Sequence, residues 1–476
     1  MILESPSEPT REELFALIQS LAAENGLLKA RLAELERRLG LNSSNSGKPP
    51  SSDGLKKPAR VTSLRAKSGK KPGGQKGHAG ETLRQADAPD KVVDHFPAVC
   101  GGCGAALTRE MSRDYAARQV FDLPEPRPLV VTEHRVHVCR CAGCGGTSPG
   151  AFPEGVNAPV QYGPRIAAFA AYLQHGQLLP EKRLAATMAD LFGVKIATAT
   201  LANMSRARAG RMRGFVEAVR DLVADAPVKH MDETGFRIGG ALRWLHVAST
   251  GLLTFYRACA KRGSLLADVA GVVVHDHWKP YFKMPGVSHA LCNAHHLREL
   301  KALVEIEKEE WARKMQRLLR RACHATNLAR AAGVVLKPGL VARIERRYDT
   351  LVAEGLAFHQ AQPPLSRATP KGGGKRRGRV PLRTGHNLLL RFQTRRQDAL
   401  RFLRDPAVPF SNNLAEGDLR MTKLRQKISG GFRTPDGAED FATIRSFIST
   451  ARKQGWNIIE ALGKDPDELV NTLRLA

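Results

Sequence analysis

The stretch VKHMDETGFRIGGALRWLHVASTGLLTFYRAC, residues 228–259, decides the fold of this chain. Its later parts, ALRWLHVAST and LLTFYRAC, are apolar runs rich in β-forming residues, and a Gly-containing turn precedes them. This pattern predicts consecutive strands of a meander. Asp232 then lies on the first strand or at its end. Burying a carboxylate there costs free energy unless it is paired or binds a metal.

Two further acids follow in distant segments. Asp276 closes GVVVHD, a continuous apolar run that favours a buried central strand over a helix, and a carboxylate at the carboxyl end of such a strand faces a crevice. Glu416 lies in SNNLAEGDLRMTKLRQK, residues 411–427. The Ser and Asn residues at 411–413 supply N-cap chemistry, so this segment is predicted to be a helix.

The predicted helix combines an acid with a row of cations. Glu416, Arg420, Lys423 and Lys427 share one face at 3.6 residues per turn. The cations are expected to bind DNA phosphates. Three acids from distant segments suit Mg²⁺ or Mn²⁺, and a pair of such ions about 4 Å apart activates the attacking oxygen and steadies the leaving oxygen in phosphodiester chemistry.

Two neighbouring acids compete with these assignments. Glu233 and Asp418 are alternative ligands to Asp232 and Glu416. An isolated acid is more often a solvated surface residue or a helix cap, so the hypothesis depends on the ordered set.

The order of strand acid, meander, strand acid and helix acid resembles the ribonuclease-H-like catalytic core of DDE transposases. More closely, nearly the whole chain resembles the large transposase of the insertion sequence 66 family. The motifs that carry this resemblance are DETG (232–235), HDHWKPY (275–281), NNLAE (412–416), NSSNSGKPPSSD (42–53) and KPGGQKGH (71–78).

The resemblance implies a DNA transposase that binds the terminal inverted repeats of its own mobile element. Hydrolysis at an element end would be followed by in-line attack of the freed 3′-hydroxyl on target DNA, with no covalent protein intermediate. Asp232, Asp276 and Glu416 would be the catalytic acids and would hold two Mg²⁺ ions. Small accessory proteins from the same element are also implied.

One departure from the family pattern concerns the helix acid. Arg usually follows the helix Glu, whereas this chain has Gly417, which costs up to about 1 kcal/mol in a helix and removes a phosphate contact. This leaves open a catalytically decayed, zinc-containing DNA-binding regulator. A structure-selective nuclease that cuts without joining is a second alternative.

Composition agrees with a nucleic-acid partner. The 476 residues include 74 Lys and Arg against 46 Asp and Glu, a net charge of +28, and this excess predicts a polyanionic partner. The sequence has no apolar run long enough to predict a membrane span. The segment MILESPSEPTREE lacks the features of a signal peptide. We therefore expect a bacterial cytoplasmic protein that is nucleoid-associated when bound to DNA.

The cysteines are grouped as metal ligands rather than as a disulfide framework. Five of the eight lie between residues 100 and 144, and Cys100-Gly-Gly-Cys103 and Cys141-Ala-Gly-Cys144 repeat one knuckle. Together the knuckles predict a structural Zn²⁺ site in a zinc-ribbon-like fold, with RQVFDLP and LVVTEHRVHVCR as strands. Cys139 is a competing ligand, and a redox pair is the weaker alternative.

The N-terminal segment has a heptad pattern. Leu14, Leu21, Leu28 and Leu35 repeat every seven residues, and Asn25 occupies an inner companion position. This predicts a leucine-zipper-like helix that makes a homodimer or higher oligomer, with a single amphipathic helix packed on the protein as the alternative. The following segment is rich in Ser, Pro, Gly, Lys and Arg and is typical of a flexible basic linker along DNA.

Together these features predict a multidomain α+β protein. Its ribonuclease-H-like α/β core contains a helical insertion and is preceded by a coiled coil, a zinc-ribbon-like module and a helical DNA-binding region. The predicted segments are a coiled-coil helix (1–41), a basic linker (42–90), a zinc module (91–153), a helical region (154–225), the first part of the core (226–290), the helical insertion with a basic loop (291–404), the second part of the core (405–450) and a helical tail (451–476).

Four remaining features carry alternatives. Residues 182–201 resemble a helix-turn-helix, but two core helices without DNA contact are the alternative. The loop KGGGKRRGR is predicted to bind phosphate, as are its residues Lys371, Lys375, Arg376 and Arg377. Cys292-Asn-Ala-His295 offers a metal-ligand step, although packing beside the active-site crevice is the preferred interpretation. His275 and His277 flank Asp276 and are candidate phosphate contacts, but strand alternation turns them away from it.

Overall fold

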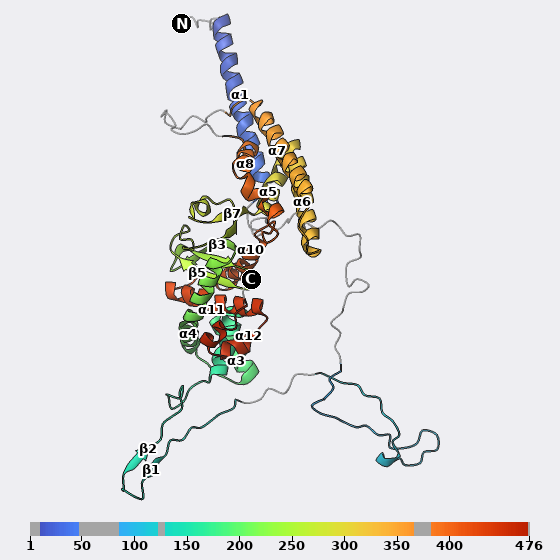
Figure 1. The fold of residues 1–476 in the computed structure, drawn as a ribbon, viewed down its shortest axis with the longest axis vertical. Helices are drawn as coiled ribbons and strands as arrows, with labels where there is room; N and C mark the ends of the chain where they lie inside the picture. Colours follow the sequence, from blue (N-terminus) through green and yellow to red (C-terminus); the bar gives the residue numbers. More distant parts are fainter. Residues whose placement is uncertain (1–9, 47–84, 122–128, 366–381, 475–476) are drawn as a thin grey trace, which may run out of the picture. The chain divides into compact units, whose positions relative to one another are not determined.

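The computed structural model describes residues 10–46, 85–121, 129–365 and 382–474. The chain divides into two compact units. The larger comprises residues 1–64, 152–186 and 196–476, and the smaller comprises residues 65–151 and 187–195. A five-stranded sheet lies in the larger unit, and a two-stranded sheet lies in the smaller one (Figure 1).

The larger unit is built on a mixed sheet with the strand order β5-β4-β3-β6-β7. Its strands are β3 (Val228–Ile238), β4 (Ala241–Ser249), β5 (Thr254–Cys259), β6 (Val272–His275) and β7 (Ser288–Leu291). β3, β4 and β5 pair in antiparallel fashion, whereas β6 joins β3 in parallel and β7 joins β6 in parallel. The predicted meander and buried strand are therefore confirmed.

The turn between β3 and β4 explains the glycine pair in the sequence. Ile238 pairs directly with Ala241, which leaves only Gly239 and Gly240 in the loop. Both glycines have positive φ values, +58° and +78°. Such a two-residue turn follows the twist of the strands, and glycine adopts it without steric cost.

Helices cover one face of the sheet around a shared core. The core brings together residues of α4 (Thr198–Asp225), β3, β4, β5 and α11 (Pro435–Gln454). At its centre the Phe215 and Phe447 rings lie 4.9 Å apart between centroids. Shorter elements complete this layer: α2 (Pro164–Ala171), η3 (Tyr172–Gly176), α12 (Ile458–Gly463) and α13 (Pro466–Val470).

The edge strand β5 is closed by hydroxyl groups of α11. The backbone N–H of Thr254 donates to Thr450 Oγ1 at 3.1 Å, and that of Tyr256 donates to Ser446 Oγ at 2.8 Å. These bonds occupy groups that an open sheet edge would offer to another strand.

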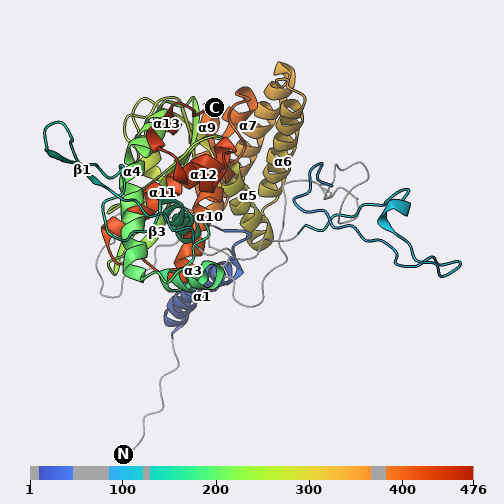
Figure 2. The same cartoon turned by 90° about the horizontal axis from the view of Figure 1, so that it is seen from below.

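A second helical layer lies in the chain between β7 and the segment of Glu416. It contains α5 (Asn293–Ala302), η5 (Leu303–Glu307), α6 (Glu310–Ala331), α7 (Pro338–Gln360), α8 (Thr384–Thr394) and α9 (Arg396–Arg404). α6 and α7 lie side by side in both views (Figures 1 and 2). Their apolar faces share a core with α5, α8 and α9.

The heptad segment forms one helix, α1 (Arg11–Gly40), opened by a capping box between Thr10 and Glu13. Gly26 lies within the helix without ending it. The heptad leucines are exposed, from 43% at Leu14 to 60% at Leu28. The end of α1 reaches the insertion, where Lys301 Nζ donates to Ser44 Oγ at 2.7 Å.

Candidate active site

Asp232 and Asp276 are brought together by the parallel pairing of β3 with β6. The register pairs His230 with Val274. Continued by two residues, it sets Asp232 beside Asp276, which immediately follows β6. Both acids therefore lie at the carboxyl end of the parallel pair, where a crevice forms.

Glu416 is carried to the same edge by α10 (Asn413–Ser429), whose position depends on Asn412. The buried Asn412 side chain donates to Met231 O at 2.8 Å and contacts His230 Nδ1 at 2.9 Å. The prediction of N-cap chemistry was right about the helix start but wrong about the bond, because Asn412 makes no side-chain cap bond. Its amide instead joins α10 to the strand of Asp232.

Burial and neighbouring acids determine the electrostatics of Asp232. Burial raises the pKa of Asp232 to about 8, and the charges of Glu233, Asp276 and Glu416 raise it further. The hydrogen bond to its carboxylate comes from the backbone N–H of Glu233, and that to Asp276 comes from the backbone N–H of Trp278. Buried carboxylates of this kind suit a divalent cation, which supplies the charge that the backbone does not.

The two competing acids are already engaged by cations. Glu233 has a side chain only 1% exposed and pairs with Arg262 at 2.7 Å, while Tyr281 donates to it at 2.5 Å. Asp418 pairs with Lys453 at 2.8 Å. These pairings make Glu233 and Asp418 poorer candidates for metal ligands than Asp232 and Glu416.

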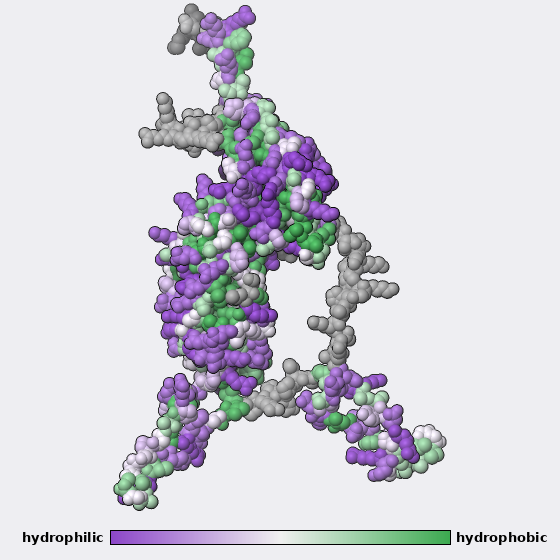
Figure 3. Space-filling view, in the orientation of Figure 1, coloured by the Kyte–Doolittle hydropathy of each residue, from purple (hydrophilic) through white to green (hydrophobic). Residues whose placement is uncertain are grey.

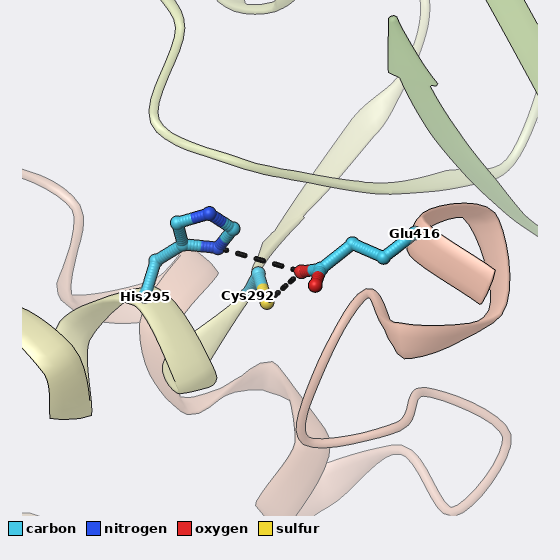
Figure 4. A group of neighbouring side chains, drawn as sticks. All are labelled: Cys292, His295 and Glu416. Atoms are coloured by element: carbon cyan, nitrogen blue, oxygen red, sulfur yellow. Dashed lines mark hydrogen bonds and ion pairs between the residues drawn. The ribbon is translucent and has the colours of Figure 1, made fainter. Parts of the chain in front are cut away.

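Three side chains of the α5 region surround Glu416, and Figure 4 shows two of them, Cys292 and His295. Cys292 Sγ and His295 Nδ1 each lie 3.7 Å from Glu416 Oε1, and Arg298 lies 3.4 Å from Oε2. The preferred interpretation of Cys292 and His295, polar contact at the active-site crevice, agrees with this placement. Arg298 was missed, although its spacing of three residues from His295 on a helix was a usable signal.

The histidines beside Asp276 turn inward. His275 is fully buried, stacks on Tyr281 at 4.6 Å between centroids and lies 3.1 Å from His289 between ring nitrogens. Burial lowers the pKa of His275 to about 3, so it is neutral at physiological pH. His275 is therefore a core residue rather than a phosphate contact. Burial also lowers the pKa of His277.

The predicted phosphate-binding residues fall into two groups. On α10, Arg420 and Lys427 are exposed, and burial lowers the pKa of Lys423 against the opposing effect of the Asp232 charge. Lys423 therefore lies within electrostatic reach of the acid cluster. Outside the described residues are Lys371, Lys375, Arg376, Arg377 and most of the basic linker.

The smaller unit forms both cysteine knuckles. In each, the first cysteine accepts a bond from a glycine four residues later: Gly104 N–H to Cys100 O at 2.9 Å, and Gly145 N–H to Cys141 O at 2.9 Å. Backbone N–H groups lower the pKa of the first thiol of each pair. Among the described residues, however, the four cysteine sulfurs are not gathered within 4.8 Å of one another.

Of the two strands predicted for this unit, LVVTEHRVHVCR forms one only in its last residues, and RQVFDLP lies partly outside the described residues. Its elements are η2 (Arg109–Met111), β1 (Val138–Arg140) and β2 (Thr147–Pro149), with Cys139 opposite Ser148. The runs before β1 have β-forming residues, but Val120, Val130 and Val131 are 87% to 94% exposed. β-propensity reports fit to a half-buried surface, and these valines have no such surface to pack against.

Residues 182–201 contain the two predicted helices and their turn. α3 (Glu181–Phe192) ends in an αL cap, in which Gly193 with φ +66° donates to Ala189 O, and Val194 donates to Met188 O. The next helix, α4, buries ten residues along its length. Packing of α4 in the core favours the alternative of core helices for that part of the segment.

Comparisons with known proteins show the family of this chain. Residues 159–440 match the model of the Transposase IS66 family, and residues 97–145 match the zinc-finger binding domain of transposase IS66. Residues 3–84 match a family of unknown function. An uncharacterized protein, y4jO, of Sinorhizobium fredii (strain NBRC 101917 / NGR234) is 33% identical over 115 residues, which are 22% of this chain and 36% of the relative. The matched region is thus about a third of that relative's length.

The two matched models describe a class of protein, the transposases, and a zinc-finger domain found in them. The family model spans more than half of the 476 residues, so this chain belongs to the IS66 family of transposases. Within the described residues, no helix combines the length and the apolar character needed to cross a bilayer.

Proposed function

We propose that this transposase cuts and joins DNA at the ends of its own element, with Asp232, Asp276 and Glu416 as the catalytic carboxylates. The observation that carries the proposal is the convergence of a β3 acid, an acid after β6 and an α10 acid at one sheet edge. Three antiparallel strands followed by two parallel ones are the arrangement expected of a ribonuclease-H-like core, which supports the same conclusion.

The carboxylates fit two Mg²⁺ or Mn²⁺ ions, which when bound would activate the attacking oxygen and stabilise the leaving oxygen. Without a cation, Asp232 holds a proton at neutral pH because its pKa is about 8. Asp232 would give up that proton if it bound a cation. Arg298 holds Glu416 Oε2 at 3.4 Å and so orients the other carboxylate oxygen.

The chain's cations are arranged to hold the DNA backbone beside the acids. Arg420, Lys423 and Lys427 follow Glu416 along one face of α10. On α6, the exposed residues Arg317, Arg320 and Arg321 form a second positive surface. Figure 3 shows hydrophilic side chains gathered over the α6–α7 region. These contacts would position the duplex without reading its sequence, which we assign to the zinc module together with α3.

We also propose that Cys100, Cys103, Cys141 and Cys144 hold one structural Zn²⁺. Each thiol pair lies within a glycine turn, and the lowered pKa of Cys100 and Cys141 favours the thiolate that zinc requires. In addition, the exposed leucines of α1 fit the α1 helix of a second copy, giving a dimer on paired element ends.

Cleavage and joining of a labelled element end tests the catalytic assignment. Wild type should join the end to target DNA with Mg²⁺ or Mn²⁺. Asp232→Ala, Asp276→Ala and Glu416→Ala should each reduce joining by at least about a hundredfold, since even outer-shell partners of a metal are worth that much. Glu468→Gln, an exposed acid on α13, is the matched control. Binding without cutting by wild type would indicate a decayed regulator, and cutting without joining would indicate a nuclease.

A further inference from the structure

Glu416 belongs to a second constellation besides the acid cluster. Cys292 precedes α5, His295 lies in its first turn and Glu416 lies in the first turn of α10. One ligand atom from each residue lies within 4.8 Å of the other two. Among the described residues, no other set of three His, Cys, Asp or Glu side chains has this geometry.

The spacing of the three atoms matches a tetrahedral metal. Zn–S and Zn–O bonds of about 2.3 and 2.0 Å set sulfur and oxygen about 3.5 Å apart at the tetrahedral angle, and nitrogen and oxygen about 3.3 Å apart. Glu416 Oε1 lies 3.7 Å from Cys292 Sγ and 3.7 Å from His295 Nδ1. Arg298 contacts the other oxygen, Oε2, so Oε1 is the atom that faces the thiol and the imidazole.

The surroundings are prepared for a thiolate and a neutral imidazole. The backbone N–H of Asn412 donates to Cys292 Sγ at 3.1 Å, and those of Ala294 and His295 also favour the thiolate. Burial opposes these bonds and raises the pKa of Cys292. His295 Nδ1 is buried, makes no hydrogen bond and is directed at Glu416 (Figure 4).

The donor set selects the type of ion. Thiolate and imidazole favour Zn²⁺ and related thiophilic ions, whereas Mg²⁺ prefers oxygen ligands. We propose that Cys292, His295 and Glu416 form a binding site for Zn²⁺, and that its occupation withholds Glu416 from the catalytic cations. The inhibitory half of this inference rests on the proposed function, because it requires Glu416 to be a catalytic ligand.

The binding half is tested on the full-length chain without DNA. The protein is equilibrated with Zn²⁺, freed of unbound metal, and its zinc content per chain is measured by atomic absorption. Loss of either ligand should weaken zinc binding at this site at least about tenfold. Cys292→Ser and His295→Ala should therefore each retain one ion fewer per chain than wild type. Cys323→Ser, which changes a buried cysteine on α6, should match wild type. Equal zinc content in wild type and both site variants overturns the proposal. If Cys292→Ser does not fold, His295→Ala still tests the site, because His295 is only half-buried.

The inhibitory half is tested by titrating Zn²⁺ into Mg²⁺-dependent cleavage. Each protein is scaled to its own activity without added zinc. Wild type and Cys323→Ser should lose activity at a Zn²⁺ concentration at least about tenfold lower than His295→Ala. Zinc that binds at this site without inhibiting would overturn the regulatory role. Absence of cleavage in every protein, with zinc content still dependent on Cys292, would contradict the proposed function and leave the metal site in place.

Discussion

The cysteine knuckles of the smaller unit and the acid site of the larger unit both gather metal-ligand side chains, but they are built differently. Each knuckle is encoded within about six residues, and its sulfurs are exposed or half-exposed. The acid site joins a strand, a strand end and a helix, and the bond from Asn412 to Met231 spans 181 residues of sequence. A locally encoded site needs its metal to complete the fold around it, whereas a site assembled by packing is formed before the metal arrives.

Removal of zinc should therefore produce the largest difference between the two units. Chelation should increase amide hydrogen exchange at Gly104 and Gly145 in the smaller unit and leave β3 and α11 protected, since binding energy at a structural zinc is folding energy. Hydrogen exchange read by mass spectrometry measures both units in one sample. Cys100→Ser should behave as the chelated protein, and Cys139→Ser, which lies outside both knuckles, should behave as wild type. Equal exchange with and without chelator would contradict a structural zinc.

The acid site, unlike the knuckles, should lower the free energy of unfolding until a cation binds. The pKa of Asp232 is about 8 in the folded chain against 3.8 as the ordinary value, so the folded state binds the extra proton between these pH values. Stability in EDTA should therefore be greatest below pH 4 as far as this group is concerned, and fall as pH rises towards 8.

Asp232→Asn removes this penalty. We expect it to raise the free energy of unfolding at pH 8 by a few kcal/mol and to abolish cleavage. Urea unfolding of wild type and variant at several pH values measures the effect, with Glu468→Gln as the control. A loss of stability in Asp232→Asn at pH 8 would show that the carboxylate is paired rather than isolated.

A prediction of intermediate size concerns the residue that joins the helix to the sheet. Asn412→Ala leaves Met231 O and His230 Nδ1 without their partner in a buried place, which costs about 1–3 kcal/mol. Cleavage should also fall, because α10 carries Glu416. The neighbouring, exposed Asn413→Ala is the matched control. Similar urea midpoints for the two variants would mean that α10 is held by its apolar contacts alone.

The elements that sequence reasoning predicted well are those with local or periodic signals. The strands around Asp232 alternate with glycine turns, and the helix of Glu416 follows three polar residues. Both elements can therefore be predicted from the sequence alone. The role of Asn412 cannot, because its amide is satisfied by a strand far away in the sequence. The valines before Cys139 have high β-propensity and were therefore predicted to form strands. No strand forms there because nothing in the described structure covers these side chains.

The smallest effect expected concerns Gly417, which departs from the family pattern in the first turn of α10. A side chain added there would meet no atom within 4 Å, so the glycine is not required by space. Gly417→Ala should therefore stabilise the chain by about 0.5–1 kcal/mol.

Gly417→Arg should add a phosphate contact and steepen the salt dependence of DNA binding by about one unit of log–log slope. Gly431→Ala is the contrasting control, because its added carbon would lie 2.2 Å from Arg237 O and should destabilise the chain. If Gly417→Arg increased joining several-fold with an unchanged fold, the acid site would be intact. The rate of joining in the wild type would then be limited by its affinity for DNA. An unchanged salt slope would mean that this position of α10 does not face the backbone, and would shift the DNA path towards Lys423 and the cations of α6.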